Sequence, residues 1–215
     1  MDELGPIDIK RRTGTELFCD RDHPLEFDLL SFWQWSASDV VTNATRGILA
    51  EYLVGQALGV APGSVREEWA AYDLETHNGT RVEVKSAAFI QSWPQKALSR
   101  ISFMVPKTRA WDKETNRHSH EAKRQADVYV FALLGHTDQQ TIDPLNVSQW
   151  EFFVLPTVRL DRRERSQHSI TLPSLRKLAN SVAFAELSCA VDGAACIQKR
   201  SGQQAAEADA EKPRR

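Results

Sequence analysis

The sequence predicts an α/β protein, and three patterns of residues carry this prediction. Apolar residues recur with helical spacing over residues 42–58, two runs of alternating polar and apolar residues flank Asn78-Gly79, and an unbroken apolar run covers 127–134. These patterns are typical of an amphipathic helix, a β-hairpin and a strand covered on both faces.

Length and composition indicate an ordinary globular chain. It has 215 residues, of which 41% are hydrophobic and 26% charged, so we expect one domain with a sizeable core. No apolar run approaches the roughly 18 residues of a membrane span, and the start Met-Asp-Glu-Leu-Gly is unlike a secretory signal. Three scattered cysteines favour a reducing compartment, so we expect a cytoplasmic protein with no membrane partner.

Changes in composition along the chain predict three parts. Residues 1–40 carry four Lys and Arg against nine Asp and Glu and include an aromatic cluster, and we expect this segment to pack on the core. Residues 41–195 should form the main domain. Residues 196–215 are rich in Gln, Ala and charge without an aromatic residue, which indicates a disordered tail.

The main domain begins with the predicted helix, which Thr42 or Asn43 can cap and Gly59 can end. The later elements follow from runs of strand and helix character. They are strands at 69–76, 80–86, 101–105, 127–134 and 150–155, and a helix at 173–185.

The turn of the hairpin decides which side chains share a face. A two-residue turn would set polar residues opposite apolar ones on both faces of the hairpin. A three-residue loop, His77-Asn78-Gly79, with Gly79 in the left-handed conformation, sets Asp73 opposite Glu83 and places all polar residues together. Because a one-residue slip would bury carboxylates, the sequence predicts the three-residue loop.

This register brings together groups that can do chemistry. Directly opposed residues have Cβ atoms about 4.5–5.5 Å apart, so Asp73 and Glu83 would repel each other unless a cation lay between them. Their hard oxygen atoms suit Mg²⁺ or Mn²⁺. Lys85 projects from the same face and could orient or deprotonate a water, so the parts needed for phosphodiester hydrolysis are present. The alternative is a surface hairpin with solvated cross-strand ion pairs.

The predicted helix adds a further carboxylate. Asn43, Gly47, Glu51 and Gly55 recur every four residues and therefore share one stripe of the helix. Glycine inside a helix costs about 0.5–1 kcal/mol relative to alanine, so two glycines there indicate close approach of another surface. The alternative is that Glu51 is an exposed helix glutamate.

Together, Glu51, Asp73 and Glu83-Val84-Lys85 resemble the ordered motif of the PD-(D/E)xK nuclease superfamily. The resemblance covers residues 42–135, and Tyr72 stands where the motif has proline. It implies a restriction-endonuclease-like fold, in which helices flank a mixed sheet with an antiparallel meander.

The resemblance also implies roles for these residues. Asp73, Glu83 and the Val84 backbone carbonyl would bind Mg²⁺ or Mn²⁺, Lys85 would activate the water, and Glu51 would hold a water or a second metal. Downstream residues that could contact the substrate are Gln91, Trp93 and Gln95.

A basic stretch follows the hairpin and could neutralise DNA phosphates. Residues 94–125 carry eight Lys and Arg against three Asp and Glu. Each of these cations could instead lie on a solvated surface. The eight are Lys96, Arg100, Lys107, Arg109, Lys113, Arg117, Lys123 and Arg124.

The leading hypothesis is therefore a metal-dependent nuclease that hydrolyses DNA phosphodiester bonds, of restriction, defence or repair type. A homodimer or a partner subunit would suit a duplex target, since both strands must be cut. The alternatives are a catalytically silent module of the same fold that binds nucleic acid or joins a complex, and an α/β interaction protein without a nucleic-acid role.

Overall fold

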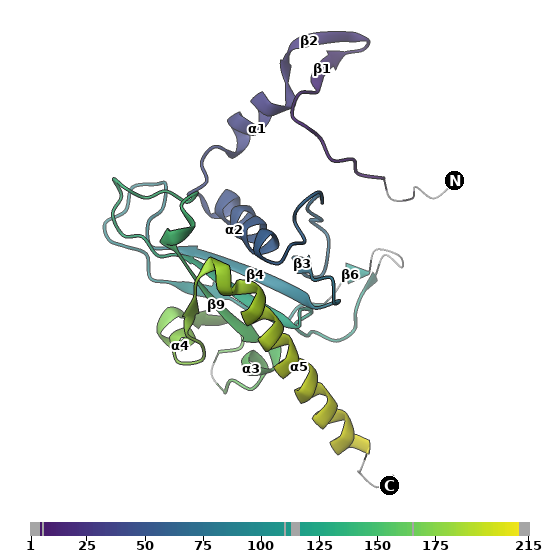
Figure 1. Ribbon diagram of the computed structural model, residues 1–215, viewed down its shortest axis with the longest axis vertical. Helices are drawn as coiled ribbons and strands as arrows, with labels where there is room; N and C mark the ends of the chain where they lie inside the picture. Colours follow the sequence, from purple (N-terminus) through teal and green to yellow (C-terminus); the bar gives the residue numbers. More distant parts are fainter. Residues whose placement is uncertain (1–4, 6, 110, 113–116, 165, 211–215) are drawn as a thin grey trace.

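The computed structural model describes residues 5, 7–109, 111–112, 117–164 and 166–210 (Figure 1). Its centre is a five-stranded sheet in the order β11-β9-β8-β4-β3. The strands are β3 (Leu74–Glu75), β4 (Arg81–Ala88), β8 (Val128–Leu134), β9 (Trp150–Pro156) and β11 (Ser181–Val182). β4 and β8 are parallel and the other neighbours antiparallel, so the sheet is mixed, as the sequence predicted.

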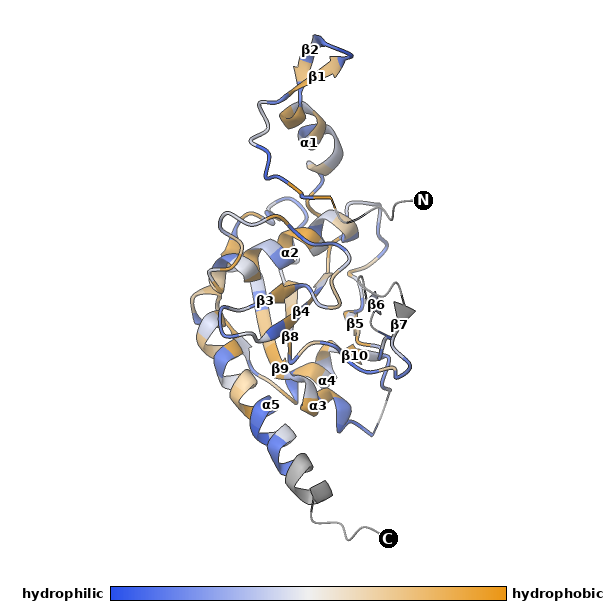
Figure 2. Ribbon diagram, turned by 90° about the vertical axis from the view of Figure 1, so that its right-hand side faces the viewer, coloured by the Kyte–Doolittle hydropathy of each residue, from blue (hydrophilic) through white to orange (hydrophobic). Residues whose placement is uncertain are grey.

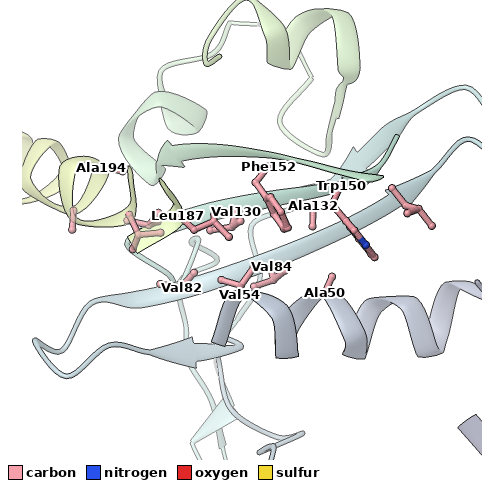
Figure 3. Packing of buried hydrophobic residues seen from close by; sticks show 14 of the residues in the cluster. Ala50, Val54, Val82, Val84, Val130, Ala132, Trp150, Phe152, Leu187 and Ala194 are labelled. Carbon is pink, nitrogen blue, oxygen red and sulfur yellow. The ribbon is translucent and has the colours of Figure 1, made fainter. Parts of the chain in front are cut away.

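The apolar run at 127–134 forms the middle strand of this sheet. All seven residues of β8 are buried, because helices or further strands cover both faces. On one face, Val82, Val84 and Val130 pack against α2 (Asn43–Ala57) and α5 (Leu187–Ala210) (Figure 3). On the other, β8 packs against α3 (Thr157–Asp161), α4 (Leu172–Arg176) and β5 (Ser102–Met104).

α2 agrees with the predicted helix at 42–58 to within one residue at each end. Thr42 is its N-cap residue and Leu58 its C-cap, and Gly59 follows with a φ of +72°. This left-handed conformation is one that glycine adopts without strain, which explains why the helix ends there.

The hairpin between β3 and β4 confirms the three-residue loop. Leu74 pairs with Val82 and Glu75 with Arg81, and Gly79 has a φ of +73°. The strand before the loop is shorter than expected, since only two residues pair regularly. Asp73 lies just beyond β3, where its backbone N–H donates to the Val82 carbonyl at 3.1 Å.

The predicted pairing of the third strand with the hairpin is wrong. β5 forms within 101–105, but it pairs with β10 (Ser169–Thr171) in a separate two-stranded sheet. The predicted helix at 173–185 is also mostly wrong, because α4 ends at Arg176 and β11 follows. The remaining short elements are β6 (Trp111–Asp112), β7 (Arg117–His118) and the 3₁₀ helices η1 (Val147–Gln149) and η2 (Phe184–Glu186).

The N-terminal segment forms a hairpin and a helix that project from the rest of the molecule (Figure 1). The elements are β1 (Leu17–Asp20), β2 (His23–Asp28) and α1 (Leu29–Ala37), and none of their residues is buried. These elements thus differ from the expected packing on the core, although Arg11 lies beside α2. The three-part division of the chain stays a prediction.

The C-terminal segment differs from the expected disordered tail. α5 starts at Leu187 and continues to Ala210, well beyond Cys196. Its first half is anchored by buried Leu187 and Val191, and its later turns are hydrophilic (Figure 2). Gln, Ala, Glu and Lys are strong helix formers, so a segment without aromatic residues can extend an anchored helix. Among the described residues, no helix is long and apolar enough to cross a membrane.

Candidate active site

The polar face of the hairpin lies at the edge of the central sheet. Along β4, Val82 and Val84 are buried against α2, whereas Glu83 and Lys85 are half-buried on the opposite face. This alternation follows from the period of two in a strand. It places the carboxylate and the ammonium side by side, as the sequence predicted.

Asp73 is bound to this edge through its side chain. β3 begins only at Leu74, so no strand residue pairs with Val84 on that side. The Asp73 carboxylate takes this place, and its Oδ2 accepts the Val84 N–H at 2.7 Å. A bond from a backbone amide to a carboxylate is stronger than a neutral one, so Asp73 is held against β4.

The surroundings of Asp73 disfavour its charged form. Burial is the largest cause, the Glu83 carboxylate is the next, and together they raise the pKa of Asp73 to about 7. The Val84 amide and the Lys85 ammonium act in the opposite direction but do not offset these causes. A carboxyl group with such a pKa is a candidate functional group, since it changes charge near neutral pH.

Glu83 and Lys85 form an ion pair. Lys85 Nζ lies 2.5 Å from Glu83 Oε1, and the two side chains are 30% and 19% exposed. The pair holds the ammonium group at the sheet edge. Because Lys85 is paired with Glu83, Asp73 has no ion pair with a cation among the described residues.

Glu51 comes from α2 and is paired with a residue that sequence reasoning missed. The Arg66 guanidinium donates two hydrogen bonds to the Glu51 carboxylate, from Nε to Oε2 at 2.5 Å and from Nη2 to Oε1 at 3.0 Å. Glu51 and Asp73 line one cavity of about 320 Å³, which we call the carboxylate hollow. Glu51 therefore faces the same space as Asp73.

The glycine stripe of α2 is explained at one position only. A Cβ on Gly55 would lie 2.9 Å from the Ala61 Cβ, so close approach requires glycine there. A Cβ on Gly47 would meet nothing within 4 Å. The predicted close approach is thus confirmed at Gly55 and wrong at Gly47.

The predicted metal-site residues form no ready-made cluster of side chains. Among the described residues, no group of three or more His, Cys, Asp or Glu is gathered to hold a metal ion. Asp73, Glu83 and Lys85 meet at the β4 edge, and Glu51 reaches the hollow beside them. The arrangement therefore offers two carboxylates at the edge and a third nearby that is bound to Arg66.

The two downstream glutamines are engaged within the protein. Gln91 is buried and donates to the Ala88 carbonyl at 2.9 Å, and Gln95 Oε1 accepts the Gln91 N–H at 2.7 Å. These bonds hold the loop at 89–99 in place. A direct contact of either glutamine with a substrate stays a prediction.

The other downstream candidates are exposed or lie elsewhere. Trp93 and Arg100 line a second cavity beside Lys85, and Lys107 and Arg109 are exposed beyond β5. Arg124 is buried, so the expectation that it meets DNA is wrong. Lys113 lies outside the described residues.

Sequence reasoning also missed Arg46 of α2. Its guanidinium is buried near β4, where its Nε donates to Ser86 Oγ at 3.0 Å. A cation near the N-terminus of a helix is disfavoured by the helix dipole. This unusual position is the sequence signal by which Arg46 could have been recognised. Arg66 lies in an irregular segment that offers no such pattern.

Known protein families place the chain among the nucleases. The model of the family described as bacteriophage T4 endonuclease IV matches residues 28–173, which is more than half of the 215 residues. The chain therefore belongs to this family. The matched range contains the β4 edge and Glu51, and the family indicates a nuclease that acts on DNA. No curated protein matches the chain.

Proposed function

We propose that the protein is a metal-dependent endonuclease of the PD-(D/E)xK type, which hydrolyses DNA phosphodiester bonds at the β4 edge. The observation that carries this proposal is the half-buried Asp73 carboxylate, held on β4 beside the Glu83–Lys85 pair. The mixed sheet and the order helix-Glu, hairpin-Asp and Glu-x-Lys support it as well.

The donor set of the edge fits Mg²⁺ or Mn²⁺. Asp73 and Glu83 are hard oxygen ligands, and their mutual repulsion, together with burial, raises the pKa of Asp73 to about 7. In a strand, the amide and carbonyl of one residue point to the same side. Because the Val84 amide faces Asp73, the Val84 carbonyl lies on that side of β4 as well. This orientation supports the proposed role of the carbonyl as the third ligand of the metal. Such a set suits Mg²⁺, which usually takes one or two carboxylates and keeps several waters.

A divalent cation in this place would lower the pKa of a water and neutralise charge on the phosphate. The residues of the chain would do the rest. Lys85 would orient the attacking water and offset charge on the phosphate, while Glu83 holds its ammonium in place. Water attack in line would break the bond from phosphorus to the leaving oxygen. Glu51, once released from Arg66, would bind a further water or a second cation.

A silent module of the same fold is the second candidate. It is favoured by the two ion pairs, because Glu83 and Glu51 are already neutralised by Lys85 and Arg66. Such a module would bind DNA, alone or within a complex, without needing the β4 edge.

Cleavage of a panel of linear, supercoiled, single-stranded and branched DNA, with Mg²⁺, Mn²⁺ or EDTA, separates these candidates. We expect cutting that requires the metal and falls about a hundredfold or more in Lys85→Ala. Lys199→Ala, at an exposed lysine of α5 outside the basic stretch and both hollows, is the matched control and should keep the wild-type rate. The DNA that is cut would also separate restriction, defence and repair roles.

Folded wild-type protein that binds DNA but cuts no member of the panel would overturn the endonuclease proposal. The same protein would then be the silent module, and its DNA affinity should be equal in the wild type and in Lys85→Ala. A second subunit would be indicated if the rate of duplex cutting rose more steeply than in proportion to protein concentration.

A further inference from the structure

A second cavity of about 460 Å³ lies beside the β4 edge, and we call it the basic hollow. Residues of α2, β4, the loop at 91–100 and β5 line it. Three cations line it, namely Arg46, Lys85 and Arg100, and no Asp or Glu is among its described lining residues. A concave surface with one sign of charge concentrates ligands of the opposite sign.

Arg46 makes the charge of this hollow unusual. The residue is only 3% exposed, and every acceptor that the structure gives it is neutral. These acceptors are Val41 O at 2.6 Å, Asn43 Oδ1 at 2.6 Å, Ser86 Oγ at 3.0 Å and Gln91 Oε1 at 3.4 Å. Burial lowers the pKa of Arg46, which reflects the cost of placing this charge away from water.

Two other arginines of the protein are paired with carboxylates. Arg124 is buried and paired with Asp161, and Arg81 is paired with Asp127. A buried cation usually has such a partner, because an uncompensated charge is costly. Among the described residues, no carboxylate pairs with Arg46, so its positive charge is not offset and can attract an anion in the hollow.

The wall of the hollow is held in a fixed shape. Gln91 joins Arg46 to the loop, since its Oε1 accepts from Arg46 and its Nε2 donates to the Ala88 carbonyl. Gln95 donates to Ser99 Oγ at 2.9 Å and ties the two ends of the loop together. Preorganised walls reduce the entropy lost when a ligand binds.

The rim of the hollow carries an aromatic side chain and an exposed cation. Trp93 is 49% exposed, so a face of its indole can meet a ligand. Arg100 is exposed at the same rim. Stacking on an aromatic ring and contact with a guanidinium are two common ways in which proteins hold nucleotides.

We propose that the basic hollow binds one nucleotide of the substrate strand next to the cleaved bond. Its phosphate would face Arg46 and Arg100, and its base would stack on Trp93. Lys85 lines this hollow and Asp73 lines the carboxylate hollow, so the strand would cross the β4 edge between them. This inference rests on the proposed function, because it assigns the strand that the edge would cut.

Binding without metal tests the hollow separately from cleavage. In EDTA, the affinity of the full chain for a labelled DNA oligonucleotide is measured at several salt concentrations. Trp93→Ala should weaken binding about fivefold to a hundredfold, because stacking of one base is lost. Arg100→Gln should reduce the slope of log affinity against log salt by about 0.7–0.9, the value of one phosphate contact.

Two further arms identify the ligand. Lys96→Gln changes an exposed cation of the same loop that does not line the hollow, and should leave stacking and competition unchanged. Thymidine 5′-monophosphate should displace the oligonucleotide better than inorganic phosphate does, and this advantage should vanish in Trp93→Ala. Arg46→Lys, with its melting temperature measured alongside, tests the buried charge while keeping it positive.

The outcomes are distinct. If the wild type cuts DNA but Trp93→Ala and Arg100→Gln bind as the wild type does, the hollow is not a nucleotide site. If the wild type cuts nothing but the variants lose affinity as stated, the nucleotide site stands and the endonuclease proposal fails. Equal competition by thymidine monophosphate and inorganic phosphate would overturn the proposal that a base stacks on Trp93.

Discussion

At the scale of single residues, the proposed active site depends on the position of Asp73. Its place on the polar face could be predicted, because strand alternation and the left-handed Gly79 are local properties of the sequence. Its bond to the Val84 amide could not, since that bond requires β3 to begin only at Leu74, after Asp73. Arg46 was missed for a related reason, because its burial depends on contacts with β4, forty residues later.

The raised pKa of Asp73 predicts how stability depends on pH. Its pKa in the folded protein is about 7, against 3.8 as the ordinary value, so the folded state holds a proton that the unfolded state loses. Metal-free protein should therefore lose stability as pH rises from about 4 to 7. In Asp73→Asn this loss should be absent. Between pH 4 and 7, the free energy of unfolding of this variant should therefore rise by roughly 2–4 kcal/mol relative to that of the wild type.

Urea unfolding in EDTA at pH 4 to 8 measures this effect. Glu75→Gln, a neighbouring carboxylate in the same hairpin, serves as the control. Parallel curves for wild type and Asp73→Asn would show that Asp73 has an ordinary pKa in the folded protein.

The two glycines of α2 predict opposite effects of one substitution. Gly47→Ala should stabilise the protein by about 0.5–1 kcal/mol, because the added Cβ meets nothing and alanine favours the helix. Gly55→Ala should destabilise it by about 1–3 kcal/mol, because its Cβ would lie 2.9 Å from that of Ala61. Thermal unfolding of both variants checks this, and shifts of equal sign would contradict the packing described.

At the scale of elements, prediction succeeded where one segment contains its own pattern. α2 and β8 show this, since capping residues and unbroken apolar character determine them locally. It failed for β5, whose partner β10 lies more than sixty residues away. No pattern within 101–105 indicates that a strand will pair outside the meander.

Arg124 ties the β5–β10 unit to the rest of the protein. It donates to the Val105 carbonyl after β5 at 2.8 Å and to the Gln167 carbonyl before β10 at 2.7 Å. Arg124→Ala should cost roughly 2–4 kcal/mol, because buried carbonyl groups lose their donors. Lys123→Ala, the exposed neighbour, should change stability by less than about 0.5 kcal/mol. Equal effects in chemical unfolding would contradict this structural role.

At the scale of the whole molecule, the candidate site lies between two hollows of different charge. The carboxylate hollow contains Asp73 and Glu51, and the basic hollow contains Arg46 and Arg100. The sequence predicted the carboxylates and the basic stretch, but not that α2 supplies a cation to one hollow and a carboxylate to the other. The projecting hairpin of β1 and β2 lies before residue 28, where the family match begins, apart from the last residue of β2.

The most direct test of the account is the rate of DNA cleavage against Mg²⁺ concentration at pH 6 and pH 8. Ionised Asp73 should bind the metal, so the wild type should reach half of its maximal rate at lower Mg²⁺ at pH 8 than at pH 6. Asp73→Asn should lose cleavage about a hundredfold or more, while Glu75→Gln keeps it. Cleavage in EDTA, or wild-type rates in Asp73→Asn with the same dependence on Mg²⁺, would contradict a metal site at the β4 edge.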